Sequence, residues 1–224
     1  MRFKQSVFIL STWWTQIARE FEPFGERLIF AGLNEPRGRQ NEWTGGTPET
    51  RENLNKLNQA FVDAVRATGG NNATRFLLVP THAASADANA FNGFVVPTDS
   101  ANDRIGIAVH TYSPFNWAHD GRGEYGGADE IRGSLERVAR QSERLGVPVM
   151  LTEWGSINNG RNASQREQHA YDYVSIAREL GMAVFWWDNN NSDSSGGHTF
   201  GLFDRRTSEI VYPEIIAAMR RAAS

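Results

Sequence analysis

Two glutamates stand where apolar runs of the sequence end. Glu35 follows LIFAGLN at 28–34, and Glu153 lies near the end of VPVMLTEW at 147–154. A carboxylate is costly to bury, so neither side chain is expected to serve packing alone. Two carboxyl groups about 5 Å apart can hydrolyse a glycosidic bond with retention, one as nucleophile and one as general acid/base. Each could instead be a salt-bridged or capping residue, but two in equivalent positions favour catalysis.

Aromatic and imidazole side chains end two other apolar runs. His110 and Tyr112 are two residues apart in IGIAVHTY at 105–112, so on a strand their side chains would point to one face. Trp187 is a candidate stacking platform, because the apolar face of a pyranose packs well on an indole ring. Trp186 would point the opposite way and is expected to be structural. Weaker candidates for outer sugar subsites are Trp43, Trp117 and Trp154.

Short apolar runs predict five strands. They contain nearly continuous rather than alternating hydrophobic residues, which is typical of strands buried on both faces of a parallel sheet. The runs are 28–34, 75–80, 105–112, 147–154 and 182–189.

Helices are predicted between these strands. Thr47 with Pro48 has the pattern of an N-cap followed by a first-turn proline, and Ser164 with Glu167 has the spacing of a capping box. Apolar residues three and four apart predict further helices over 7–21, over 131–145 and after Pro213.

Strands that alternate with helices indicate an α/β protein, either doubly wound or a barrel. No GxGxxG opens a helix, which argues against a dinucleotide-binding fold. In a (β/α)8 TIM barrel the C-terminal strand ends meet at one site, which suits the chemistry-bearing residues found there. Such a barrel needs eight strands and about 250 residues. We therefore expect an incomplete barrel in which strands 4–8 are present and strands 1–3 are absent.

Four motifs resemble those of the glycoside hydrolase family 5 cellulases, in particular bacterial endo-β-1,4-glucanases and xyloglucanases. They are LNEPR at 33–37, HTYSPFNWA at 110–118, LTEWGS at 151–156 and FWWDNN at 185–190. Similar stretches run along nearly the whole chain. The resemblance implies that residues 1–224 are the C-terminal portion of a single catalytic domain.

The resemblance also implies roles for individual residues. Glu35 would be the general acid/base and Glu153 the nucleophile. Asn34 would contact the sugar 2-hydroxyl, a contact that strengthens in the transition state. His110 and Tyr112 would line the −1 subsite, with Tyr112 near the nucleophile. No cofactor is expected, because the carboxylates perform the chemistry, and no metal-ligand spacing is found among the histidines.

Two residues of the family pattern have no counterpart in this sequence: an arginine near the second strand and a histidine near the third. We therefore expect the chain alone to fold poorly and to hydrolyse little. One alternative is a truncated, inactive barrel that retains at most weak glycan binding. A second is a mannanase or xylanase on the same barrel, because hydrophobic patterning does not determine the sugar.

Composition excludes several classes of binding partner and of metal site. The 224 residues carry 23 Lys and Arg against 26 Asp and Glu, without a basic stripe, so no nucleic-acid partner is expected. No cysteine is present, which excludes disulfides and thiolate metal sites. No run approaches a membrane span.

The expected partner is a polysaccharide, bound by a monomer outside the cell, with any export signal in the missing N-terminal region. The polar stretch at 189–198 is expected to be a mobile active-site loop rather than a cation site.

Overall fold

A computed structural model describes residues 3–40, 42–193 and 197–224. The chain divides into two compact units, Met1–Val109 with Gln141–Val149, and His110–Arg140 with Met150–Ser224. Within the described residues, no helix combines the length and apolar character needed to cross a membrane.

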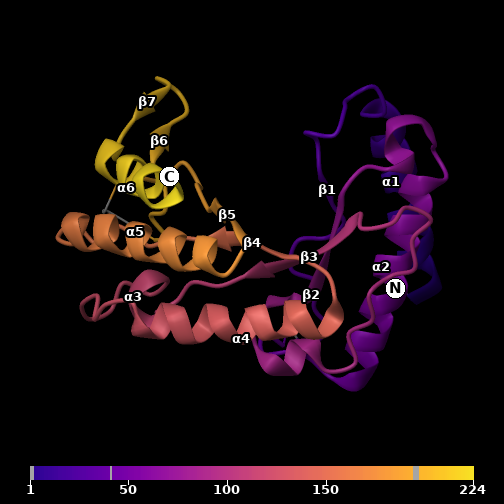
Figure 1. The fold of residues 1–224 in the computed structure, drawn as a ribbon, viewed down its shortest axis with the longest axis horizontal. Coiled ribbons are helices and arrows are strands. Elements are labelled where there is room, and N and C mark those ends of the chain that lie inside the picture. The colour runs from indigo at the N-terminus through magenta and orange to yellow at the C-terminus, as the bar shows by residue number, and fades with distance from the viewer. Residues whose placement is uncertain (1–2, 41, 194–196) are drawn as a thin grey trace. The chain divides into compact units, whose positions relative to one another are not determined.

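The first unit alternates helices with strands (Figure 1). Strand β1 pairs in parallel with β2, with Phe30 opposite Leu77. The ladder continues to β3 and on to the start of β4, because Leu77 donates its amide to Arg104 and Ile107 donates to Pro148. The elements are α1 (Phe3–Glu20), β1 (Phe30–Ala31), α2 (Pro48–Arg66), the 3-10 turns η1 (Gly70–Ala73) and η2 (Ala88–Phe91), β2 (Leu77–Ser85) and β3 (Ile105–His110).

Helix α2 begins as the sequence predicts. The Thr47 side chain accepts the amide of Thr50, the Thr50 side chain accepts the amide of Thr47, and Pro48 takes the first turn. This reciprocal cap satisfies amides that the first helical turn leaves without partners.

Helix α1 lies beside α2, and only part of the apolar stripe predicted over 7–21 is buried. Leu10 of that stripe is buried and so is Ala18, whereas Ile17 and Phe21, which share the spacing of three and four, are 38% and 41% exposed. The small Ala18 brings the backbone close to η1, where the buried Asn72 side chain donates to the Ala18 carbonyl at 2.6 Å. The face that packs inward is therefore set by this close approach as well as by hydrophobicity.

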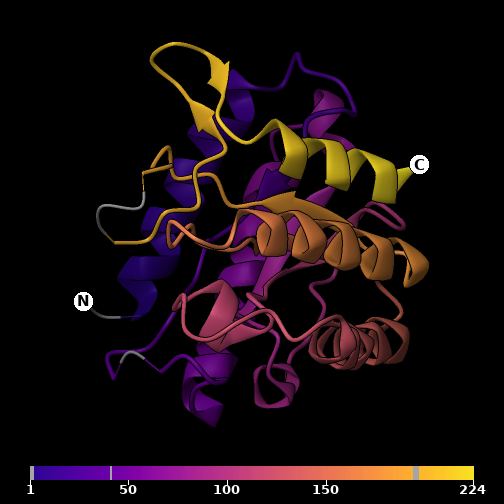
Figure 2. The ribbon, with the colours of Figure 1, turned by 90° about the vertical axis from the view of Figure 1, so that its left-hand side faces the viewer.

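The second unit contains the remaining elements. Strand β4 pairs in parallel with β5, and helices α5 and α6 lie side by side (Figures 1 and 2). The elements are α3 (Phe115–Ala118), α4 (Asp129–Leu145, whose last residues belong to the first unit), β4 (Val149–Trp154), α5 (Ala163–Glu179), β5 (Ala183–Trp186), the hairpin of β6 (Phe203–Asp204) and β7 (Glu209–Ile210), and α6 (Pro213–Ala223).

The predicted α/β class and the five predicted strands are confirmed for the described residues. The strands follow one another in the sheet in chain order, β1-β2-β3-β4-β5. Almost every residue of β2 and β3 is buried, as continuous hydrophobicity predicts. Strand β5 differs, because Phe185 is 48% exposed. The β6–β7 hairpin was not predicted, since two-residue strands leave no hydrophobic pattern.

One predicted cap is wrong. Helix α5 already begins at Ala163, so Ser164 is its second residue and cannot form a capping box with Glu167. The N-cap is Asn162, which is buried. Its side chain instead donates to the Ile157 carbonyl at 3.0 Å and accepts the Asn159 amide at 3.2 Å, which holds the loop before the helix.

Candidate active site

In the second unit, two side chains converge on one oxygen of Glu153. The Tyr112 hydroxyl donates to Glu153 Oε2 at 2.8 Å, and His110 Nδ1 lies 3.3 Å from the same oxygen. Glu153 is only 9% exposed. Hydrogen bonds of this kind stabilise a carboxylate in its ionised form, which is the form that a nucleophile needs.

The strand ends place these three residues together. His110 ends β3, and the Thr111 amide donates to the Glu153 carbonyl at 3.0 Å, so the segment beyond β3 continues the ladder alongside β4. Side chains two residues apart on such a segment point to one face. The predicted shared face of His110 and Tyr112 agrees with their contact to a single oxygen.

Aromatic rings surround Tyr112 on its other sides. Its ring centroid lies 5.4 Å from His119 and 5.3 Å from Phe200, and His119 stacks on the exposed Phe115 at 4.6 Å. His198 meets His119 edge-on at 4.5 Å. Of the polar stretch at 189–198, residues 194–196 lie outside the described part of the chain, so its predicted mobility stays a prediction.

The two tryptophans at the end of β5 differ in their surroundings. Trp187 is 40% exposed, and its amide donates to the Trp154 carbonyl at 2.8 Å. Trp186 donates its indole nitrogen to the Phe200 carbonyl at 2.9 Å and packs edge-on against Trp154 at 4.9 Å. Trp187 therefore has an accessible ring, whereas Trp186 is held by the protein.

Two of the three candidate outer subsites are wrong. Trp117 is 2% exposed and Trp154 is fully buried, where it stacks on Tyr173 at 4.1 Å. No sugar can reach these rings, because the aromatic side chains they pack against already cover them. Trp43 is 50% exposed, and the Arg37 guanidinium lies 3.5 Å from its ring centroid, so one of its faces is occupied.

Glu35 belongs to the first unit, four residues beyond β1. Its Oε2 accepts a hydrogen bond from Arg37 Nη1 at 3.4 Å, and about a quarter of each side chain is exposed. Asn34 is exposed beside it. Arg37 thus contacts both Glu35 and Trp43, which the sequence pattern does not predict. The position of an arginine two residues after the glutamate was its only sequence signal.

Contacts of the segment that follows β1 fix the position of Glu35. Gly32 lies so close to Phe61 that a Cβ there would come within 2.7 Å of the ring, which only glycine avoids. Trp14 donates its indole nitrogen to the Gly32 carbonyl at 2.9 Å. On the far side of the glutamate, the Pro36 carbonyl accepts the Ala83 amide at 2.8 Å.

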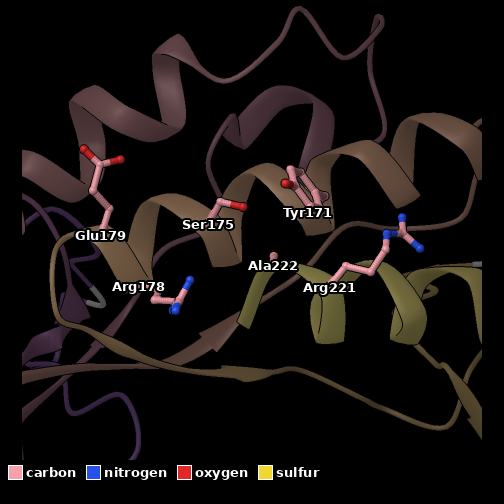
Figure 3. A pocket seen from close by; sticks show the side chains of 6 residues that line it. All are labelled: Tyr171, Ser175, Arg178, Glu179, Arg221 and Ala222. Atoms are coloured by element: carbon pink, nitrogen blue, oxygen red, sulfur yellow. The ribbon is translucent and has the colours of Figure 1, made fainter. Parts of the chain in front are cut away.

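A separate hollow lies between α5 and α6 (Figure 3). None of the predicted site residues lines it. Arg178 and Arg221 are the cationic groups of its wall, and Arg221 already pairs with Glu167 at 3.0 Å. The hollow is therefore not part of the predicted active site.

Comparison with known proteins gives a consistent result. The chain matches the family described as Cellulase (glycosyl hydrolase family 5) over residues 3–193. It is 38% identical to Endoglucanase A of Clostridium longisporum, covering 95% of this chain and 42% of that protein. Against a GH5-4 broad specificity endoglucanase from Ruminococcus champanellensis with bound cellotriose, the TM-score is 0.91 at 39% identity, over 97% of this chain and 64% of that chain. A GH5 family lichenase from Caldicellulosiruptor sp. F32 gives a TM-score of 0.89 at 34% identity, over 99% and 64%.

The chain is shorter than these proteins. It spans 26%, 42% and 44% of the length of three curated relatives that it matches. The match to the family nevertheless extends over most of the chain, and the likeness in fold confirms that its strands and helices are part of the glycosidase barrel. The chain belongs to the cellulase family, glycosyl hydrolase family 5.

Proposed function

We propose that residues 1–224 serve one catalytic activity, the endo-acting hydrolysis of β-1,4-glucan with retention of anomeric configuration. The observation that carries this proposal is the environment of Glu153. It is a nearly buried carboxylate at the end of a barrel strand, and Tyr112 and His110 meet one of its oxygens. Membership of a family of cellulases supports β-glucan as the substrate class.

The reaction proceeds in two displacements. Glu153 attacks the anomeric carbon while Glu35 gives a proton to the leaving glycosidic oxygen, and the products are a glycosyl ester on Glu153 and a shortened chain. Glu35 then removes a proton from water, which attacks the same carbon and releases Glu153. Asn34 binds the 2-hydroxyl of the sugar, and Trp187 stacks under its ring.

The glucan is cellulose, mixed-linkage glucan or xyloglucan. Similar proteins are a broad specificity endoglucanase and a lichenase, which supports more than one β-glucan as substrate. A polymer of this size does not cross a membrane, so we infer that the protein acts outside the cell. We also propose that it acts as a monomer.

Substitution of the two glutamates tests the assignment. Glu35→Gln should lower kcat on polymer by about 10²- to 10⁴-fold, because general acid catalysis is lost. An aryl cellobioside whose leaving group needs no protonation should still glycosylate Glu153 in this variant and give a burst of phenol. Glu153→Gln should abolish both reactions. Glu209→Gln, an exposed glutamate of β7, is the matched control and should leave both rates unchanged.

Three results would decide against this proposal. If either active-site variant keeps the rate of the unchanged protein on polymer, the catalytic assignment is wrong. If the unchanged protein binds glucan without releasing reducing ends, the inactive alternative is correct. If mannan or xylan is cleaved faster than every β-glucan, the sugar is wrong although the chemistry stands.

A further inference from the structure

The buried face of α5 carries polar side chains. Arg166, His169 and Tyr173 lie three and four residues apart, and all three are 0% exposed. Each meets a backbone carbonyl in a loop that follows a strand. Arg166 Nε donates to Ser156 at 3.2 Å, His169 Nε2 lies 2.9 Å from the Ser113 carbonyl, and the Tyr173 hydroxyl donates to Thr111 at 2.9 Å.

Two of these carbonyls flank Tyr112. Thr111 and Ser113 precede and follow it, and both are buried. The Thr111 carbonyl belongs to the peptide plane just before Tyr112, and the Ser113 carbonyl to the plane between Ser113 and Pro114. Holding both carbonyls anchors the backbone on each side of Tyr112 and so limits the direction of its side chain. That side chain donates to Glu153 Oε2 at 2.8 Å.

His169 acts here as a neutral donor. Burial lowers the pKa of His169 to about 4, so the ring is uncharged near neutral pH. A neutral imidazole has one N–H, and a carbonyl can only accept, so Nε2 carries the hydrogen. Among the described residues, Nδ1 has no hydrogen-bond partner. The Ser113 carbonyl is therefore the group to which this buried histidine donates its hydrogen bond.

The same two residues also contact the segment that carries Glu153. Trp154 stacks on Tyr173 with ring centroids 4.1 Å apart and planes 8° apart, and it lies 5.9 Å from His169. Helix α5 thus holds both partners of the Tyr112–Glu153 hydrogen bond, one through backbone carbonyls and one through the next residue.

We propose that His169 and Tyr173 are positioning residues that set the hydrogen bond between Tyr112 and Glu153. Apolar side chains of similar size would fill the same space without burying polar groups. What the polar groups add is a fixed direction for the loop that carries Tyr112. The effect on hydrolysis rests on the proposed function, whereas the effect on the Tyr112–Glu153 distance does not.

Kinetics test the first effect. Tyr173→Phe keeps the stack on Trp154 and removes only the hydroxyl, and His169→Phe removes the donor. Each should lower kcat about 10-fold with little change in KM, since small misplacements of reacting groups are costly. His169→Gln keeps an N–H donor and should stay within about 3-fold of the unchanged protein. Tyr171→Phe, on the exposed face of the same helix, is the matched control and should leave kcat unchanged.

A double-mutant cycle separates positioning from loss of stability. In a Tyr112→Phe background no hydroxyl remains to be positioned, so Tyr173→Phe and His169→Phe should lower kcat by less than about 2-fold further. If either lowers kcat as strongly in that background as alone, the residue acts elsewhere and the proposal is overturned.

Crystal structures of the variants test the second effect without any need for activity. In Tyr173→Phe and His169→Phe the Tyr112 hydroxyl should move beyond hydrogen-bond distance of Glu153 Oε2, and in His169→Gln it should stay. An unchanged distance in both Phe variants overturns the proposal. If the unchanged protein releases no reducing ends but the hydroxyl moves as expected, the proposed function fails and the positioning role stands.

Discussion

At the scale of single residues, the carboxyl group of Glu153 is oriented by one residue at the end of β3 and one just beyond it. Tyr112 and His110 both meet Oε2, one at 2.8 Å and the other at 3.3 Å. A carboxyl group held at one oxygen cannot rotate freely about its last bond. The orientation of the proposed nucleophile therefore depends on a neighbouring segment of the chain, His110 to Tyr112, and not only on its own strand β4.

Removal of the Tyr112 hydroxyl should expose this dependence. A hydrogen bond to a charged group is worth roughly 1.5–3 kcal/mol, so Tyr112→Phe should lower kcat/KM about 10- to 100-fold. Initial rates on soluble glucan measure the effect. Tyr171→Phe serves again as the control, and a Tyr112→Phe variant with unchanged kcat/KM would show that the contact does not serve catalysis.

His169 should make stability depend on pH in a defined interval. Burial, aided by the charge of Arg166, lowers its pKa to about 4, whereas an unfolded histidine titrates near 6.5. Above pH 6.5 both states are neutral and stability is unaffected. As pH falls from 6.5 to 4 the unfolded chain takes up the proton first, so the free energy of unfolding decreases by up to about 3 kcal/mol.

Urea unfolding at pH 7, 5.5 and 4.5 checks this dependence. His169→Gln does not titrate, so it should lose less stability than the unchanged protein across the interval. His82, whose pKa burial also lowers, is present in both proteins and cancels in the comparison. Equal losses in the two proteins would show that His169 is not the group responsible.

At the scale of elements, the helix starts differ in how they are secured. Thr47 closes a reciprocal cap on α2, whereas the Asn162 side chain makes no cap bond at the start of α5 and holds a loop instead. Removing the Thr47 hydroxyl should weaken α2, and removing the Asn162 side chain should loosen the loop before α5.

Thr47→Ala should cost about 1 kcal/mol of unfolding free energy, because the Thr50 amide loses its acceptor. Urea unfolding measures the loss. Thr12→Ala is the matched control, since the Thr12 hydroxyl only donates back to Phe8 within the exposed face of α1 and secures no helix end. A loss of equal size in both variants would show that the cap contributes nothing specific.

At the scale of the whole molecule, the proposed activity is cleavage within a long polymer. An endo-acting enzyme shortens chains from their middle, so the viscosity of a soluble β-glucan should fall steeply while few reducing ends appear. Both quantities are measured in the same reaction. A proportional fall, with cellobiose as the first product, would indicate release from chain ends and contradict the proposal.

Sequence patterns predicted the strands and the residues at their ends, because a buried parallel strand leaves a continuous apolar run and a site leaves polar residues after it. They did not predict contacts to backbone atoms. His169 and Tyr173 bind carbonyls 56 and 62 residues away, which no spacing reveals. Trp154 was misread as a possible sugar platform because a tryptophan beside a glutamate looks the same in sequence whether it is buried or exposed.

The buried asparagines bear on the choice of an expression host. Asn72-Ala-Thr and Asn162-Ala-Ser are acceptor sequences for N-linked glycosylation in the eukaryotic secretory pathway. A sugar on either amide nitrogen would replace the hydrogen bond to Ala18 or Ile157, at sites that are 0% and 3% exposed. Glycosylation during synthesis would therefore compete with folding. In a secretory yeast, Asn72 and Asn162 should be modified only in molecules that fail to fold. The exposed Asn190 begins a third acceptor sequence, Asn190-Asn-Ser, and can carry a glycan on the folded protein.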